Sequence, residues 1–426
     1  MKNDIENNLQ KKIISFVNKN KKNNYKQYSD NNYFNTWVLN FGNYFLRKKF
    51  LNISFLNDIK LLFILFYKKN ISKNYNFFFN LKNENLLKKK FLNLIISFKT
   101  NNTDFDNHFS SNRSQTKNSL WILINLSETS FFEKSENITL SKKKKYNHYF
   151  IKLKTVILFL FWFFLSNKKH EDTNIIKTLE EVINKINLHS IKKIFLPYEA
   201  QPYQKYLINL IKKKNPTCKI IAYCHGGLPS LPIEYVANNL IDKIYIHSKI
   251  ERDILIKFFR WKKSKVFLTR SFRHIDNKKI KPNKIYLPYS FTFNQKLKED
   301  LNFIFSKYNL RIIKIASHPF TKNSFSERKL LEYVKQLKYN KNLKQNKKEK
   351  VAIFLGVTGS ILEALQNNFK VIHITNNPQF ESYSNFLWKN INVIKISHRI
   401  FVYKLKKKNN LIMYSKKNFF IKKNKL

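Results

Sequence analysis

The chain has 426 residues, of which 43% are hydrophobic, so it can form two or three domains with sizeable cores. Lysine and arginine number 81 against 27 acidic residues, which gives a formal net charge of +54. The lysines are dispersed and accompany no zinc-finger, helix-turn-helix or RNA-binding pattern, so we expect no nucleic-acid partner. Anionic membrane surfaces and anionic substrates are the binding partners that this charge favours.

The first 190 residues give few clear signals of secondary structure. Residues 1–50 are expected to be partly helical, and the apolar runs 58–66 and 119–126 are expected to be buried strands or short helices. The polar stretch 101–118 and the lysine-rich stretch 141–147 are expected to be loops, the second of them exposed.

One apolar segment in this half raises the question of membrane contact. Residues 156–165 form the longest uncharged apolar run, with ten residues, whereas a helix needs about 20 to cross a bilayer. We expect a buried helix, with an interfacial helix as the alternative because lysines flank the run. The N-terminal segment lacks an apolar signal core, so we expect a cytoplasmic protein, peripheral on the inner membrane if it contacts lipid.

A regular alternation begins near residue 190. Apolar runs predict strands at 191–197, 218–223, 241–248, 265–268, 311–317, 351–355 and 370–374. Helical patterns lie at 201–215, 250–259, 296–308, 326–337 and 360–368. Strands that alternate with helices form βαβ units and parallel sheets, so the sequence predicts an α/β fold with two Rossmann-like lobes.

The two lobes are expected to be joined by a linker. The proline-containing segment 280–290 is the best candidate for it. The chain then divides into an N-terminal lobe at 1–285, with 1–50 as a helical extension, a C-terminal lobe at 286–400, and a basic tail at 401–426.

Glycine is scarce, and its positions indicate two loops. Of five glycines, four lie in two clusters, Gly226 with Gly227 and Gly356 with Gly359, and each cluster follows an apolar strand. Glycine allows positive φ and lets a ligand approach the backbone closely. We interpret the clusters as two places where the backbone contacts a ligand, as in a two-lobed enzyme; two ordinary turns are the alternative.

The cluster after residue 355 carries the most chemistry. Its sequence, LGVTGSILEAL, places Thr358, Gly359 and Ser360 in a loop, and Ser360 with Glu363 fits the S-x-x-E capping box of a helix start. Unpaired N–H groups and the helix dipole at such a start attract a phosphate. We expect the three loop residues to contact phosphate, while Glu363 either does the same or only completes the cap.

A histidine follows another strand of the same predicted lobe. His318 lies at the carboxyl end of strand 311–317, where ligands bind in open α/β sheets, and Pro319 keeps it out of helical backbone angles. An imidazole there can neutralise a leaving phosphate. Taken alone, the His-Pro pair also fits a simple turn.

Glu199 and His225 follow two consecutive strands of the N-terminal lobe, so they are expected at one edge of its sheet. Glu199 is a candidate general base, or else a dipole partner of the helix that Gln201 opens. The His-Gly-Gly sequence at 225–227 can form an esterase oxyanion hole, but the chain has no G-x-S-x-G nucleophile elbow.

Several other chemistries have no motif here. The chain has neither a G-x-G-x-x-G fingerprint nor a P-loop. Asp104 and Asp106 lie in a polar loop and are expected to be solvated. Cys218 and Cys224 lack the partners of a metal site, so we expect both to be reduced thiols that pack in the core. We therefore expect no metal and no cofactor.

Two segments together resemble a known family. YEAQPYQKYLI and KIIAYCHGGLP resemble bacterial surface-carbohydrate glycosyltransferases of the GT-B fold, which build lipopolysaccharide and capsule and typically read Tyr-Glu-x-Gln-Pro-Trp-Glu, then Gly-Tyr-Gln-His. The His-Pro and TGSILEAL segments resemble the donor motifs of sialyltransferase-like and Kdo-transferase-like GT-B enzymes. The resemblance covers about 190–375. This chain departs from the family pattern at Tyr203, Gln204, Ala222 and Cys224, and it lacks the acidic Asp/Glu-Asp/Glu-Gly motif of sialyltransferases.

The resemblance implies a metal-independent, inverting glycosyl transfer from a nucleotide-sugar, with a CMP-sugar favoured. The C-terminal lobe would bind the donor through His318, Pro319, the 358–360 loop and Glu363.

On the acceptor side, the N-terminal lobe would bind a surface glycan or lipid-linked acceptor through Gln201, Gly226 and Gly227, with Glu199 or His225 as the base. A CDP-polyol phosphotransferase-like GT-B enzyme and a catalytically inactive glycan- or membrane-binding protein are the alternatives.

Overall fold

The structure is a computed structural model, and it describes only part of the chain. The described residues are 4–19, 74–80, 89–98, 118–125, 137–145, 180–199, 202–224, 226–237, 239–270, 280–288, 291–308, 310, 314–317, 325–336, 350–406 and 411. The predictions for 58–66, 156–165 and nearly all of 101–118 lie outside them.

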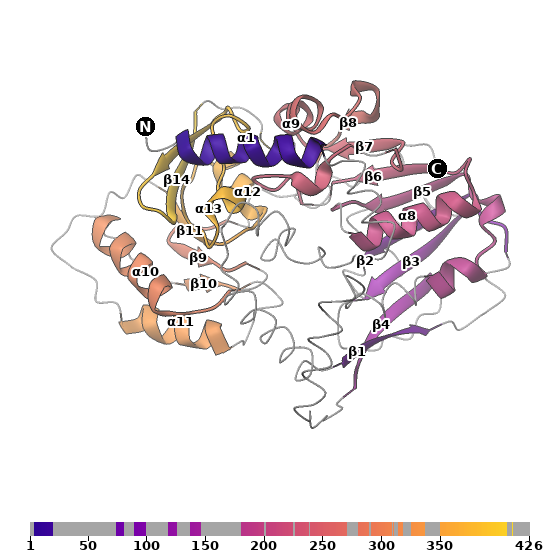
Figure 1. Ribbon diagram of the computed structural model, residues 1–426. Coiled ribbons are helices and arrows are strands. Elements are labelled where there is room, and N and C mark those ends of the chain that lie inside the picture. Colours follow the sequence, from indigo (N-terminus) through magenta and orange to yellow (C-terminus); the bar gives the residue numbers. More distant parts are fainter. Residues whose placement is uncertain are drawn as a thin grey trace, which may run out of the picture. The chain divides into compact units, whose positions relative to one another are not determined.

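The strands form two sheets, and most pairs within them are parallel (Figure 1). The first sheet has eight strands in the order β1-β4-β3-β2-β5-β6-β7-β8. Their bounds are Asn74–Asn80 (β1), Asn93–Phe98 (β2), Ser119–Asn125 (β3), Asn137–Lys145 (β4), Lys193–Pro197 (β5), Lys219–Tyr223 (β6), Lys243–Ile246 (β7) and Val266–Leu268 (β8). Strand β1 runs antiparallel to β4, whereas β4, β3, β2, β5, β6 and β7 are successively parallel.

The second sheet has six strands in the order β10-β9-β11-β12-β14-β13. Their bounds are Lys284–Tyr286 (β9), Lys314–Ala316 (β10), Val351–Leu355 (β11), Lys370–Ile374 (β12), Ile391–Lys395 (β13) and Ile400–Leu405 (β14). Strands β10, β9, β11 and β12 are parallel, and β14 is antiparallel to both of its neighbours. The predicted fold class, α/β with two Rossmann-like lobes, is confirmed.

One helix precedes the strands and the others lie between them in the sequence. They are Asp4–Lys19 (α1), Pro202–Lys214 (α8), Lys249–Phe259 (α9), Gln295–Tyr308 (α10), Phe325–Gln336 (α11), Ser360–Gln366 (α12) and Pro378–Glu381 (α13), with single 3-10 turns at Leu188–Ser190 (η2), Ile233–Tyr235 (η3) and Lys263–Lys265 (η4). Residues 180–185 are also helical. Among the described residues, no helix is both long enough and apolar enough to cross a bilayer.

Three sequence predictions are corrected by the strands. The segment 280–290 is not a linker, because β9 lies inside it and pairs with both β10 and β11. The lysines at 142–145 belong to β4 rather than to a loop. The predicted basic tail at 401–426 begins inside β14. This strand is apolar except for one lysine near its end. Local composition does not reveal these strands, because each is defined by its backbone pairing with a neighbouring strand.

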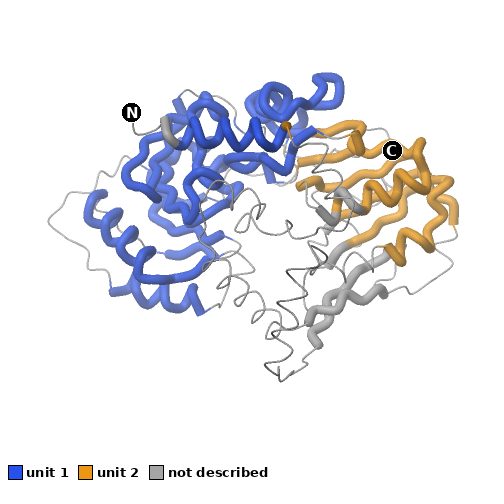
Figure 2. Tube along the Cα trace, viewed as in Figure 1, with its two compact units in different colours: residues 1–18, 226–237, 246–416 blue, residues 19–225, 238–245, 417–426 orange. Residues whose placement is uncertain are grey.

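The chain divides into two compact units whose segments are interleaved (Figure 2). Unit 1 comprises 1–18, 226–237 and 246–416, and unit 2 comprises 19–225, 238–245 and 417–426. These units differ from the two contiguous lobes, at 1–285 and 286–400, that the sequence predicts. Helix α1 belongs to unit 1, where the Asn18 amide donates to the Phe258 carbonyl (2.8 Å).

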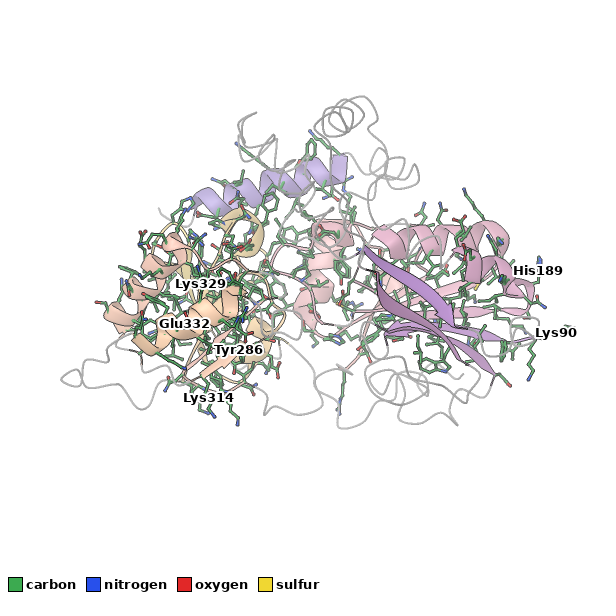
Figure 3. The ribbon with its side chains drawn as sticks, turned by 90° about the horizontal axis from the view of Figure 1, so that it is seen from below. Lys90, His189, Tyr286, Lys314, Lys329 and Glu332 are labelled. Carbon is green, nitrogen blue, oxygen red and sulfur yellow. The ribbon has the colours of Figure 1, made fainter. Side chains whose placement is uncertain are left out.

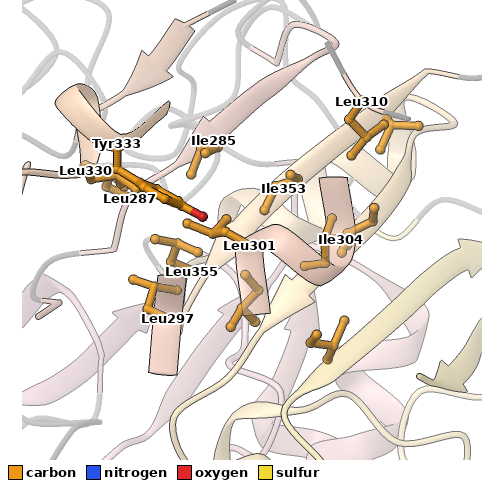
Figure 4. Packing of buried hydrophobic residues seen from close by; sticks show 14 of the residues in the cluster. Ile285, Leu287, Leu297, Leu301, Ile304, Leu310, Leu330, Tyr333, Ile353 and Leu355 are labelled. Carbon is orange, nitrogen blue, oxygen red and sulfur yellow. The ribbon is translucent and has the colours of Figure 1, made fainter. Parts of the chain in front are cut away.

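Each unit has its own core. In unit 1, one face of the second sheet packs against α10 and α11 (Figure 4), and its most buried members include Ile285, Leu301, Leu330 and Ile372. On the opposite face of that sheet, Tyr286 at the end of β9 (Figure 3) stacks on Phe354 of β11, with 4.8 Å between ring centroids. Burial of each such side chain contributes about 1.5–3 kcal/mol, so these cores fix the loops that leave the strands.

Candidate functional site

The second sheet has a topological switch point between β9 and β11. The two strands are parallel neighbours, but the chain continues from β9 to β10 on one side and from β11 to β12 on the other. Open α/β sheets bind ligands beyond the carboxyl ends of strands at such a point. The two loops that start here are in contact, because a Cβ on Gly356 would lie 3.4 Å from Cγ of Pro288. The predicted phosphate loop at 358–360 follows directly.

The first sheet has its own switch point, between β2 and β5. These strands are also parallel neighbours, and the chain continues from β2 to β3 on one side and from β5 to β6 on the other. Glu199 lies two residues beyond the carboxyl end of β5 and is half-buried. Each sheet therefore places one of the segments predicted from sequence at the position where its topology favours ligand binding.

Gln204, in the first turn of α8, sets the backbone at Glu199. Its buried amide donates through Nε2 to the Pro197 carbonyl and accepts the N–H of Glu199 at Oε1 (3.0 Å). A side-chain amide can donate and accept at once, whereas an ionised carboxylate can only accept. These two hydrogen bonds therefore explain why this chain has glutamine at 204, where the family that it resembles has glutamate.

The two glycine clusters meet in unit 1. A Cβ on Gly359 would lie 2.7 Å from the carbonyl oxygen of Gly226, closer than real side chains approach a backbone atom. Gly227 has φ of 83°, in the region that favours glycine. The clusters were predicted to mark places where the backbone contacts a ligand. In the structure Gly359 of one cluster lies against the Gly226 carbonyl of the other, so tight packing between the two loops explains the glycine at 359.

His373, on β12, fixes the carbonyl of Gly356 where the loop leaves β11. Its Nε2 lies 2.6 Å from the Gly356 oxygen and its Nδ1 lies 3.1 Å from the Tyr403 hydroxyl. A carbonyl only accepts, so Nε2 carries the proton and the Tyr403 hydroxyl donates to Nδ1. That hydroxyl oxygen in turn accepts the N–H of Tyr383 (3.3 Å). Burial lowers the pKa of His373 to about 4, so the ring is neutral at physiological pH and the network is intact.

The start of α12 differs from the prediction. The helix begins at Ser360, so the cap position falls on Gly359, which has no side chain to cap with. The capping box of Ser360 with Glu363 is therefore wrong, because the cap position lies against Gly226 and leaves no room for a side chain. Instead the Thr358 hydroxyl accepts the N–H of Ser360 (3.3 Å), and Glu363 is buried. Within the described part of the chain, no hydrogen bond uses the N–H of Thr358 or Gly359.

A capping box does form at the start of α9, at a position the sequence reasoning missed. Ser248 accepts the N–H of Glu251 (3.2 Å), and the Glu251 carboxylate accepts the N–H of Ser248 as well as that of the preceding His247 (2.8 Å). The S-x-x-E pattern at 248–251 was available as a signal. This carboxylate also accepts the N–H of Leu228, which follows Gly226 and Gly227. That bond depends on the tertiary fold and has no sequence signature.

Four predicted site residues lie outside the described residues: Gln201, His225, His318 and Pro319. Ser317, which precedes His318, donates its hydroxyl to the buried carboxylate of Glu327 on α11. That hydrogen bond anchors the end of β10, from which the His-Pro segment continues.

The cysteines are packing residues, as predicted. Cys218 and Cys224 are free and buried, and burial raises the pKa of Cys218 to about 12, so its thiol stays protonated. Across the described ranges, no three His, Cys, Asp or Glu side chains come together in a way that could hold a metal ion.

Comparison with known proteins gives weak similarities only. No family model matches the chain, and no curated protein does. A UDP-N-acetylglucosamine 2-epimerase from Rickettsia bellii is 13% identical, with 66% of this chain and 73% of that chain covered and a TM-score of 0.33. A glycosyltransferase from Rickettsia africae ESF-5 is 12% identical, with 68% and 86% covered and a TM-score of 0.32. TM-scores this low do not establish a common fold, so we base the proposed function on this chain's own residues.

Proposed function

We propose that this chain is a glycosyltransferase of the GT-B type, which moves a sugar from a nucleotide-sugar donor, a CMP-sugar in the favoured case, to a surface glycan or lipid-linked acceptor. One observation supports this most: the switch point of each sheet coincides with a segment that the sequence selected, Glu199 in the first sheet and 356–360 in the second. Two doubly wound sheets with a candidate site on each suit a reaction between two substrates.

The donor phosphate would bind at the loop after β11. The N–H groups of Thr358 and Gly359 have no acceptor among the described residues, and the Thr358 hydroxyl lies beside them. Such groups stabilise charge that develops on a departing phosphate. His318 and Pro319 would complete this site from the end of β10, and Glu363 would support it from α12.

The acceptor would react near the loop after β5. Glu199, or alternatively His225, takes the proton from the acceptor hydroxyl. The hydroxyl oxygen forms the new bond to the anomeric carbon while the bond from that carbon to the phosphate oxygen breaks, and the nucleotide leaves with the electron pair. Inversion follows from this single displacement. Gln201, Gly226 and Gly227 would shape the acceptor side, and no metal takes part.

The basic charge would assist a peripheral location. A formal charge of +54 favours an anionic leaflet, where each suitably placed lysine contributes roughly 1 kcal/mol. Sedimentation with phosphatidylserine vesicles tests this part separately, since the membrane and donor proposals can fail independently.

A transfer assay tests the reaction itself. The purified chain is incubated with CMP-, CDP-, UDP- and GDP-linked donors in chelator, and nucleotide release and glycan products are measured. We expect release with one nucleotide class only and a loss of about 10²- to 10⁴-fold in rate for Glu199→Gln. The matched control is Glu181→Gln, an exposed glutamate on the helical residues 180–185 of the same unit, which should keep the wild-type rate.

The outcomes separate the roles. An unchanged rate in Glu199→Gln together with a loss in His225→Ala would assign the base to His225. A phosphate-containing product from a CDP-polyol would identify a phosphotransferase instead, and no release from any donor would contradict transfer.

A further inference from the structure

Glu251 connects two segments that are far apart in the sequence. It is the third residue of α9, and its side chain is 0% exposed. One carboxylate oxygen, Oε1, accepts the N–H of Leu228 (2.8 Å), and the other, Oε2, accepts the N–H of His247 (2.8 Å). A capping box uses the N–H of the cap residue, Ser248, which also hydrogen-bonds this carboxylate, so neither of these two bonds is required by the cap. The first ties the start of α9 to the glycine segment 226–228.

The tie continues from this segment to the proposed donor loop. A Cβ on Gly227 would lie 3.2 Å from Oε1 of Glu251 and 3.6 Å from a methyl of Leu362 on α12. The carbonyl of the preceding residue, Gly226, lies against Gly359. All of these residues belong to unit 1. The 226–228 segment therefore lies between Glu251 on one side and the 358–360 loop on the other.

We propose that Glu251 is a positioning residue, which holds the 226–228 segment against the 358–360 loop and so sets the shape of the donor site. This inference rests on the proposed function. In this role Glu251 acts through the backbone of Leu228 and Gly227.

The protonation state of Glu251 decides whether the tie holds. Only an ionised carboxylate accepts hydrogen bonds at both oxygens, since a protonated one presents an O–H donor at one of them. Burial raises the pKa of Glu251 to about 7, although the hydrogen bonds from Leu228, His247 and Ser248 oppose this shift. The tie should therefore loosen as pH falls below neutral.

The groups around Glu251 do not provide a compensating charge. Tyr383 is the titratable group whose charge interacts with it, and burial raises the pKa of Tyr383 far above neutral, so the phenol stays uncharged. The neighbours from the glycine segment and from α12, Gly227 and Leu362, carry no charge. Among the described residues, no cation contributes to the shift.

Two variants separate positioning from simple stability. Glu251→Gln keeps the size of the side chain but turns an amide N–H toward one of the two backbone N–H groups, so one bond is lost. Ser248→Ala is the matched control, because it removes the other half of the α9 cap and leaves the Glu251–Leu228 bond in place. We expect amide hydrogen exchange at 226–228 and 357–360 to speed up by about tenfold or more in Glu251→Gln and not in Ser248→Ala.

Nucleotide affinity is the second readout, measured by calorimetry with the CMP, CDP, UDP or GDP that the native chain binds. We expect the affinity to fall by about tenfold in Glu251→Gln, and the native affinity to fall below pH 7 while that of Glu251→Gln stays flat. Unchanged exchange at 226–228 in Glu251→Gln would overturn the inference, as would equal losses in Ser248→Ala. If the native chain binds no nucleotide, the proposed function fails, and the exchange data alone then decide whether Glu251 holds the two segments together.

Discussion

The buried carboxyl of Glu251 makes a quantitative prediction about stability. Its pKa is about 7 in the folded chain against a reference of 4.5, because burial disfavours the ionised form. The folded state thus binds this proton more tightly than the unfolded state does. The contribution to stability is fully present below pH 4.5, declines as pH rises, and is lost above about pH 7. A shift of this size corresponds to a change of about 3 kcal/mol.

The measurement is a pair of urea titrations, native and Glu251→Gln, repeated between pH 4.5 and 8. Glutamine has no proton to exchange, so the difference in unfolding free energy between the two proteins should change by about 3 kcal/mol over this range, in the direction that disfavours the native chain at high pH. Ser248→Ala serves as the control: it should lower stability by about 1 kcal/mol but keep a pH dependence, because the Glu251 carboxyl is still present. A difference between native and Glu251→Gln that stays constant with pH would refute the reasoning.

Three further changes test the local geometry. Gly359→Ala should destabilise unit 1 by about 1–3 kcal/mol, because its methyl would overlap the backbone at Gly226; urea denaturation checks this, and an unchanged midpoint would contradict it. Tyr403→Phe leaves the N–H of Tyr383 without its acceptor and should cost about 1–3 kcal/mol in the same assay. Gln204→Glu should cost a similar amount at neutral pH, because the donor to the Pro197 carbonyl is lost, and a stability equal to the native chain's would argue against that bond.

The second half of the chain was largely predictable because its signals are local. From residue 190, apolar runs and helical periods alternate at short spacing, and the predicted helix at 296–308 agrees with α10 to within one residue. Strand β9 was missed because three residues between prolines carry no periodicity, and only the neighbouring β10 and β11 make them a strand. Strand β14 was missed because the prediction ended the lobe at residue 400 and assigned the following residues to a basic tail, although they pair with the nearby β13 and with β12.

The candidate site was predicted as segments rather than as contacts. The sequence selected Glu199 and the loop at 358–360, and the sheet topology places both at switch points, which no local pattern could show. The capping role of Ser360 failed because the packing of Gly359 against Gly226 overrides a local motif. Glu251 could not be assigned its second partner, since the bond to Leu228 joins residues 23 apart.

The central claim is that unit 1 binds a nucleotide-sugar donor, and thermal unfolding with added nucleotide tests it most directly. The native chain and His318→Ala are each melted with CMP, CDP, UDP and GDP. At about 100 times the Kd, one nucleotide should add roughly 2.7 kcal/mol of stability to the native chain. We predict stabilisation by one class, CMP in the favoured case, and its loss in His318→Ala. No stabilisation by any of the four nucleotides would contradict the donor site.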